Sequence, residues 1–211
     1  MADLGHAHLL RPGQVSTRPP LVLLHGSGGG EQDLVPLASG LAPGVAALAV
    51  RGNVAWENGS AFFRRFADRT IDTADILERA AVLAGFIARA GACYGFAQPP
   101  IAVGYSNGAI MAAALLLLHP GVLSGALLLR PLLPFAPEPA IRIPATPVLI
   151  VDGDEDVRRS PGDGRRLADR LELHGARVEH HVLATGHAIT ALDNEIARRW
   201  LATAIDGDVV I

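Results

Sequence analysis

The pentapeptide Gly104-Tyr105-Ser106-Asn107-Gly108 has the residue types and spacing of a turn that presents a reactive serine. It lies between an apolar run at 100–103, typical of a buried strand, and an alanine- and leucine-rich run from residue 109, typical of a helix. Gly-x-Ser-x-Gly in this setting predicts a nucleophile elbow, a strained turn that exposes the serine hydroxyl. Glycines flank the serine because a Cβ atom there would collide with the strand or the helix. Ser106 is therefore the candidate nucleophile.

A serine becomes reactive when a base and an acid support it, and after an elbow both follow in the chain, on loops behind later strands. One later strand is predicted to end in four carboxylates, Asp152, Asp154, Glu155 and Asp156. We expect Asp152 to belong to the strand end, and Asp154 and Glu155 to be solvated turn residues. Asp156 is the candidate acid because it lies far enough along to fold back, with Val157 anchoring the loop in the core.

Four of the eight histidines follow the candidate acid: His174, His180, His181 and His187. We expect His174 at the exposed end of a helix. His180 and His181 belong to a predicted strand at 177–183, whose alternation places one ring on each face, where neither reaches the elbow easily. His187 comes on the loop after that strand, at the carboxyl ends of the strands, and is the candidate base. The alternative is that His187 has no catalytic role and is an ordinary residue at the N-terminus of the following helix.

An early strand near residues 20–25 leads into a glycine-rich loop, His25-Gly26-Ser27-Gly28-Gly29-Gly30. The backbone amides of Ser27 and Asn107, the residue after the serine, are the candidate oxyanion-hole donors. A phosphate-binding loop is excluded because all 18 basic residues are arginine, so Gly-x-x-x-x-Gly-Lys cannot occur. The same lack of lysine excludes Schiff-base chemistry and a Ser-Lys dyad. We expect no metal site, because the motif His-Glu-x-x-His is missing and a single cysteine cannot form a thiolate cluster. We also expect no cofactor.

Length and composition are consistent with one well-buried domain over residues 1–211, at 50% hydrophobic residues. A net charge of −3 argues against a nucleic-acid partner. Cys93 has no partner cysteine, which favours a reducing, cytoplasmic location. We expect no secretory leader and no membrane insertion, because the apolar run at 115–118 is too short to span a bilayer. The exposed edge of an open sheet, or the terminal helices, would allow a homodimer.

Alternation of apolar strands with helices predicts an α/β fold built on a single, mostly parallel sheet with helices on both faces. Besides the elbow strand and its helix, strands are expected near 20–25, 45–50, 123–129, 146–151 and 177–183, and helices near 162–174 and 189–205. The proline-rich link at 131–147 cannot be regular throughout and is expected to border the site. The carboxyl ends of the parallel strands would thus gather the elbow, the acid and the histidine.

These residues resemble the serine carboxylesterase/phospholipase family of α/β-hydrolases, which also contains acyl-protein thioesterases. The resemblance spans about residues 20–200 and is closest to a bacterial branch linked to hydroquinone and catechol response. The shared motifs are Arg51-Gly52-Asn53, Glu57-Asn58-Gly59, Phe62-Phe63-Arg64-Arg65, the serine pentapeptide, Arg130-Pro131, Gly153-x-x-Asp156 and Gly186-His187. The resemblance implies a compact α/β-hydrolase fold without a large cap domain, ester hydrolysis, and a triad of Ser106, Asp156 and His187.

Candidate substrate-pocket residues lie in the same motifs and include an apolar wall and several charges. The candidates are Trp56, Glu57, Phe62, Phe63, Arg64, Arg65, Arg130 and Leu132. The phenylalanines are equally consistent with core packing, and paired arginines with a solvated face. Glu57 is expected either to contact substrate or to pair with Arg51 or Arg64.

The sequence therefore predicts a serine hydrolase that cleaves small carboxylic esters through an acyl-enzyme intermediate, with a small-molecule ester as its partner. A dienelactone hydrolase shares the architecture but has a cysteine at the elbow. A thioesterase, perhydrolase or acyltransferase would use the same triad, and the difference lies in which acceptor reaches the acyl-enzyme. A non-catalytic binding protein of the same fold is the alternative from another class.

Overall fold

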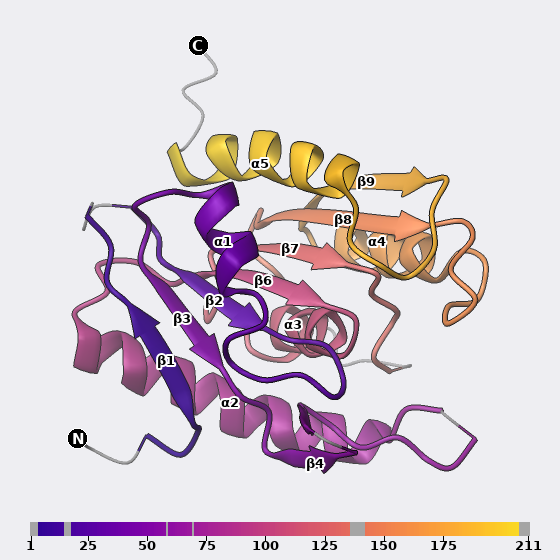
Figure 1. The fold of residues 1–211 in the computed structure, drawn as a ribbon, viewed down its shortest axis with the longest axis horizontal. Coiled ribbons are helices and arrows are strands. Elements are labelled where there is room, and N and C mark those ends of the chain that lie inside the picture. Colours follow the sequence, from indigo (N-terminus) through magenta and orange to yellow (C-terminus); the bar gives the residue numbers. More distant parts are fainter. Residues whose placement is uncertain (1–3, 15–17, 58, 69, 136–141, 207–211) are drawn as a thin grey trace.

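The computed structural model describes residues 4–14, 18–57, 59–68, 70–135 and 142–206, and its centre is a seven-stranded sheet (Figure 1). The strand order is β1-β3-β2-β6-β7-β8-β9. The bounds are β1 His8–Arg11, β2 Leu21–Leu24, β3 Ala47–Val50, β6 Ile101–Tyr105, β7 Gly125–Leu129, β8 Pro147–Gly153 and β9 Arg177–Leu183. β1 runs antiparallel to β3, and every other neighbouring pair in this sheet is parallel. The predicted mostly parallel α/β architecture is confirmed.

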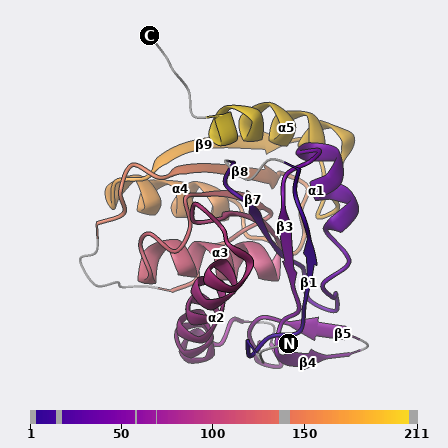
Figure 2. The same ribbon diagram turned by 90° about the vertical axis from the view of Figure 1, so that its left-hand side faces the viewer.

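Helices cover both faces of the sheet, as Figure 2 shows. Helices α1 and α5 lie on one face, and α2, α3 and α4 lie on the other. Their bounds are α1 Val35–Leu41, α2 Thr73–Tyr94, α3 Asn107–Leu118, α4 Asp163–Leu173 and α5 Ala191–Asp206. A separate hairpin, β4 Val54–Trp56 and β5 Gly59–Ala61, connects β3 to α2. The hairpin lies at the carboxyl end of the sheet, because Ser60 bridges to Gly29 after β2.

Side-chain alternation along the central strands divides the interior into two cores. In β2, Leu21 and Leu23 pack with α1 and α5, whereas Val22 and Leu24 pack with α2 and α3. All four side chains are at most 2% exposed. A strand between two helical layers buries every residue, which explains why these strands read as unbroken apolar runs.

Helix α3 lies at the centre of the molecule and is apolar on every side. Each residue from Asn107 to Leu117 is buried, because the helix packs on the sheet and is flanked by α2. A helix that is hydrophobic all round belongs in a protein core or a membrane. Among the described residues, neither α3 nor any other helix is both long and apolar enough to cross a membrane.

The chain reverses its direction across the sheet between β2 and β6. From β2 it moves outward to β3, and then returns to β6 on the other side of β2. The carboxyl ends of β2 and β6 are therefore neighbours, with Leu24 paired to Gly104. Crevices at such switch points are the usual ligand sites of open α/β sheets, so the loops after β2 and β6 are positioned to share one site.

Candidate active site

Ser106 occupies a tight turn between β6 and α3. Its backbone has φ 51° and ψ −106°, a left-handed conformation that is costly for a non-glycine residue. A Cβ atom on Gly104 would lie 2.7 Å from Ala109 Cα, and one on Gly108 would lie 2.0 Å from the Leu24 carbonyl oxygen. Helix and strands thus approach so closely that only glycine fits on either side of the serine.

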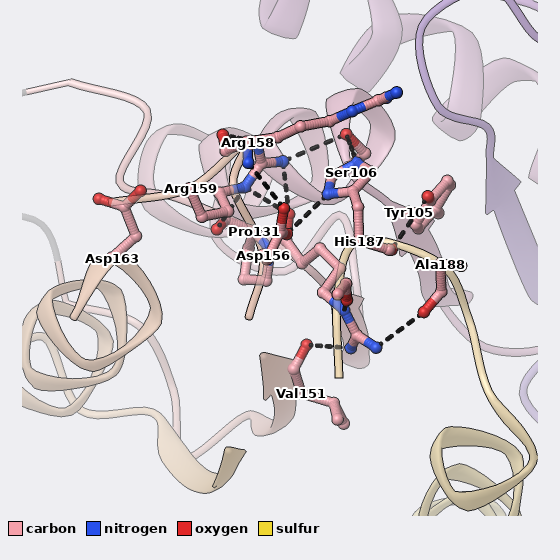
Figure 3. Close-up of polar contacts among 12 residues, drawn as sticks. Tyr105, Ser106, Pro131, Val151, Asp156, Arg158, Arg159, Asp163, His187 and Ala188 are labelled. Carbon is pink, nitrogen blue, oxygen red and sulfur yellow. Dashed lines mark hydrogen bonds and ion pairs between the residues drawn. The ribbon is translucent and has the colours of Figure 1, made fainter. Parts of the chain in front are cut away.

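The structure brings Ser106, His187 and Asp156 together in one hydrogen-bonded chain (Figure 3). His187 Nε2 lies 3.0 Å from Ser106 Oγ, and His187 Nδ1 lies 2.6 Å from Asp156 Oδ2. Asp156 can only accept, so Nδ1 donates to it and Nε2 is left to accept from the serine hydroxyl. Burial lowers the pKa of His187; the Asp156 carboxylate opposes this, and the positive charges of Arg159 and Arg158 add to it.

The loop after β8 presents Asp156 through its own hydrogen bonds. The Asp156 amide donates to the Gly153 carbonyl at 3.3 Å, and the Arg158 amide donates to Asp156 Oδ1 at 2.9 Å. The expectation that Val157 anchors this loop in the core is wrong, because its side chain is 98% exposed. The loop folds back because Asp156, which is 5% exposed, is itself the buried anchor.

The other carboxylates of this segment are directed elsewhere. Asp152 belongs to β8, as expected, and its Oδ2 lies 2.7 Å from His180 Nε2. Asp154 and Glu155 are exposed at the turn.

The remaining histidines of the C-terminal half also lie away from the serine. His181, beside His180 in β9, has its Nε2 2.6 Å from Glu179 Oε1. His174 is the C-cap residue of α4, where it is half-buried rather than exposed. Within the described ranges, none of these rings forms a hydrogen bond with Ser106, so His187 is the histidine that the fold brings to the serine.

The loop after β2 passes directly beside the elbow. A Cβ atom on Gly26 would lie 3.0 Å from the Tyr105 ring and 3.7 Å from Ser106 Cβ. Asn107 is the first residue of α3. Within the described parts of the chain, neither the Ser27 amide nor the Asn107 amide donates to another backbone group. Both predicted oxyanion donors therefore belong to segments that adjoin the serine.

Two polar side chains that sequence reasoning assigned no structural role hold these segments in place. His25 is 1% exposed; its Nδ1 donates to the Gly26 carbonyl at 2.7 Å, and its Nε2 accepts from the Gly52 amide at 3.0 Å. Burial lowers the pKa of His25, in keeping with a neutral ring. Asn107 Oδ1 accepts from the Phe62 amide at 2.7 Å, which ties the segment after β5 to the elbow.

The structure places Arg130, a predicted pocket residue, inside the protein with 0% exposure. Its guanidinium forms a two-pronged ion pair with Asp193, at 2.7 and 2.9 Å. It also donates to the carbonyls of Val151 at 3.1 Å and of Gly186 and Ala188 at 3.0 Å each. Arg130 therefore supports the loop that carries the histidine, and its side chain offers no surface to a substrate.

The histidine loop is held at three consecutive carbonyls. Arg130 binds those before and after His187, and the Tyr105 hydroxyl donates to the carbonyl of His187 itself at 3.1 Å. Asp193 also accepts from the Thr190 amide at 2.7 Å, as in a helix capping box at the start of α5. Burial opposes ionisation of Asp193, but the hydrogen bonds from Arg130 and Thr190 outweigh it and lower its pKa.

The predicted apolar wall divides into two groups. Trp56 is half-buried and lies against the β2 loop, where a Cβ atom on Gly28 would be 3.7 Å from its ring. Leu132 is also half-buried, in the segment after β7. Phe62 and Phe63 are 2% and 0% exposed and belong to the core on the α2 side. Trp56 and Leu132 are thus the members of the wall that present surface.

The two charged pocket candidates from the β5–α2 connection, Arg64 and Arg65, contact other groups of the protein. Arg64 is 59% exposed and forms ion pairs with Asp72 at 3.4 Å and Asp75 at 3.2 Å. The Arg65 guanidinium lies over the Phe63 ring, 5.7 Å from its centre. Arg64 therefore forms ion pairs at the start of α2 in this structure.

Glu57 lies at the tip of the β4–β5 hairpin, exposed and with a positive φ of 42°. It pairs with neither predicted arginine, because Arg64 binds α2 and Arg51 binds Glu31 through two bonds of 2.6 Å. The hydrogen bond from Arg51 lowers the pKa of Glu31 to about 2. Asn58, of the same predicted motif, lies outside the described residues.

Sequence reasoning missed Arg159. Its Nη2 donates to Ser106 Oγ at 3.2 Å, so the serine has a cation beside it as well as an imidazole (Figure 3). The available signal was an arginine three residues beyond the candidate acid, on a loop already expected to return to the elbow.

Comparisons with known proteins agree with this architecture. No family model matches the sequence. The chain is 36% identical over 186 residues to "Putative hydrolase MhqD" of Bacillus subtilis strain 168, covering 88% of this chain and 93% of that protein. A crystal structure of a Bacillus cereus carboxylesterase matches with a TM-score of 0.92 and 35% identity, over 95% of each chain. A crystal structure of a Mesorhizobium loti carboxylesterase matches with a TM-score of 0.89 and 35% identity, over 96% of this chain and 97% of that chain.

The fold is therefore that of the α/β-hydrolases, with the elbow, the acid loop and the histidine loop at the carboxyl ends of the strands. Within that fold, the chain belongs to the carboxylesterase-type hydrolase family that includes MhqD.

Proposed function

We propose that the protein is a serine hydrolase that cleaves small carboxylic esters through an acyl-enzyme intermediate. The observation that carries this proposal is the continuous chain of short hydrogen bonds, 3.0 Å from Ser106 Oγ to His187 and 2.6 Å from His187 to Asp156. Family membership supports the same reaction class.

In the proposed reaction, His187 Nε2 accepts the Ser106 proton while Oγ attacks the ester carbonyl carbon. Asp156 holds the ring in the tautomer that leaves Nε2 free and stabilises the imidazolium. The tetrahedral intermediate collapses when the carbon–alkoxide bond breaks, and His187 returns the proton to the departing alcohol. Water, deprotonated by the same ring, then releases the acid and restores the serine.

The amides of Ser27 and Asn107 would stabilise the negative oxygen of the tetrahedral intermediate. Loss of one such donor typically costs about 3 to 4 kcal/mol of transition-state stabilisation. The positive end of α3 adds to this stabilisation, because Asn107 is the first residue of that helix. Trp56, against the loop after β2, and Leu132, in the segment after β7, are half-buried and are proposed to contact the apolar part of the ester.

The test is the Ser106→Ala variant, assayed with p-nitrophenyl acetate and butyrate. We expect kcat to fall by about 10⁴-fold or more, because the covalent route is removed. A fluorophosphonate probe should label the wild-type protein and leave the variant unlabelled. Ser124→Ala is the matched control, since Ser124 donates to the Pro99 carbonyl at the opposite end of the strands. Full turnover by Ser106→Ala would assign the chemistry to another nucleophile.

A further inference from the structure

The side chain of Arg159 reaches the nucleophile from the same loop that carries the acid. Its Nη2 lies 3.2 Å from Ser106 Oγ, on a half-buried guanidinium. Its other acceptors are backbone carbonyls, those of Arg130 at 2.6 and 2.9 Å, Pro131 at 3.1 Å and Arg158 at 3.0 Å. These contacts fix the guanidinium beside the serine without neutralising its charge.

Among the described residues, no carboxylate lies within 4.0 Å of the Arg159 guanidinium. The carboxylate nearest to the chemistry, Asp156, already binds His187 and a backbone amide. Asp156, Asp163 and Asp152 attract Arg159 at longer range and line a cleft together with it. A half-buried cation without a contacting anion is unusual, because buried charges are normally paired.

Arg158 adds a second positive charge on the same side. Its side chain is exposed and extends past Ser106 in Figure 3. Within the described ranges, the Arg158 guanidinium has no hydrogen-bond or ion-pair partner. A fork of guanidinium donors matches the two oxygens of a carboxylate. Arg159 therefore contacts Ser106 directly, and the charge of Arg158 acts on the same site through space.

We propose that Arg159, assisted by Arg158, binds a carboxylate of the substrate, so that the enzyme selects monoesters of short dicarboxylic acids. This inference rests on the proposed esterase function. A carbonyl carbon under attack lies about 3 Å from Oγ, and a bound carboxylate oxygen lies about 2.8 Å from a guanidinium nitrogen. Because Arg159 also touches Oγ, the carboxylate and the ester carbonyl would lie close together, as they do when about two carbon atoms separate them.

Substrate binding would exchange the contact between Arg159 and Ser106 for a contact between Arg159 and the carboxylate. The serine hydroxyl then keeps its bond to His187 and is released toward the ester carbon. The backbone carbonyls of Arg130, Pro131 and Arg158 hold the rest of the guanidinium where it is. Arg159 is thus a specificity-determining residue, because its contact with a substrate carboxylate forms only with anionic substrates.

The test compares monoethyl succinate with ethyl 4-methylpentanoate, in which an isopropyl group replaces the carboxylate and the leaving group is the same. Proton release at constant pH gives kcat and KM for both esters. We expect the wild-type protein to prefer the succinate ester by kcat/KM at least about tenfold. In Arg159→Met this preference should fall by about 10- to 100-fold, mainly through KM.

Two further variants define the interaction. Arg159→Lys should keep part of the preference, because it retains the charge but loses the planar fork. Arg199→Met is the control, an exposed arginine of α5 paired with Glu195, and should leave the preference unchanged. If the wild-type protein shows no preference for monoethyl succinate, or if Arg159→Met lowers both esters equally, the subsite proposal is overturned while the esterase function stands.

A binding measurement separates the two proposals. Isothermal titration calorimetry of the Ser106→Ala variant with monoethyl succinate should give a measurable Kd. In the double variant Ser106→Ala, Arg159→Met this Kd should rise by about 10- to 100-fold. Binding of this kind together with no ester turnover by the wild-type protein would support the carboxylate subsite and refute the esterase. Equal binding to the single and double variants would refute the subsite even if esters are hydrolysed.

Discussion

Ser106 Oγ lies between a hydrogen-bond acceptor, the His187 ring, and a hydrogen-bond donor, the Arg159 guanidinium. His187 Nε2, 3.0 Å away, is positioned to accept its proton, and Arg159 Nη2, 3.2 Å away, donates to it. A nearby cation stabilises a negative oxygen and disfavours a protonated imidazole. The same guanidinium therefore acts on Ser106 directly and on His187 through space.

The pH dependence of activity should report this arrangement. Burial, with Arg159 and Arg158, lowers the pKa of His187 below 6.5 despite the opposing carboxylate of Asp156. We expect kcat/KM for a neutral ester to be constant near pH 7 and to fall on acidification only below pH 6.5, as the imidazole is protonated. Arg159→Met should move this acid limb to higher pH, because a charge that disfavours imidazolium is removed. An unmoved limb would show that Arg159 does not act on His187.

The residues differ in how far the sequence could predict them. Asp156 and His187 follow from chain order and from loops behind predicted strands, and the structure brings both to Ser106. The roles of Arg130 and Arg159 could not be predicted from the sequence, because a long side chain can point into the protein or out of it from the same position. Their directions depend on backbone turns, such as φ 54° at Arg130, that no local pattern specifies.

Among the elements, the elbow depends on close contact between backbones. The ends of β2 and β6 pair in register, and α3 begins immediately after Ser106. Gly108 lies on the first turn of α3 against the end of β2, where any side chain would meet backbone atoms that have no room to move. The position of the β2 loop relative to the serine therefore depends on a missing Cβ atom.

A Gly108→Ala substitution should be severely destabilising. The added methyl group would lie 2.0 Å from the Leu24 carbonyl oxygen, so the strand and the helix would have to separate. We expect the free energy of unfolding in urea to fall by about 3 kcal/mol or more. Gly40→Ala is the matched control, because nothing lies within 4 Å of its Cβ position in α1. The control should be neutral or stabilising by up to about 1 kcal/mol; similar losses in both variants would refute this account.

Elements with strong apolar runs were predictable, whereas those set by tertiary contacts were not. The strands β2, β3, β6, β7, β8 and β9 and the helices α3, α4 and α5 lie close to their predicted positions. The edge strand β1 and the hairpin of β4 and β5 were not predicted, because their sequences are short and partly exposed. Helices α1 and α2 were also not predicted, although Asp72 caps the start of α2 and Gly95 its end.

At the scale of the whole molecule, His25 is buried and His187 is half-buried on loops at the carboxyl ends of the strands. Burial lowers the pKa of His25 and of His187 below 6.5. The unfolded chain therefore binds protons at these positions before the folded protein does. Each group favours the folded state above pH 6.5, and its contribution is lost as the pH falls from about 7 toward the lowered pKa.

Stability should accordingly decline on mild acidification. We expect the free energy of unfolding in urea to be lower at pH 5.5 than at pH 7.5, with each histidine contributing up to about 1.4 kcal/mol per pH unit. In His25→Gln, whose amide can replace both hydrogen bonds of the ring without titrating, the decline should be shallower. Identical pH dependence in the two proteins would contradict a role for His25 in this effect.

The backbone of Arg130 is in the left-handed region, and this residue forms hydrogen bonds with two neighbouring loops. Its carbonyl accepts from Arg159, whereas its side chain binds the carbonyls on either side of His187. The guanidinium of Arg159 and the loop of His187 are consequently both held by Arg130. We therefore expect the proposed substrate subsite and the proposed base to respond together to any change at this one residue.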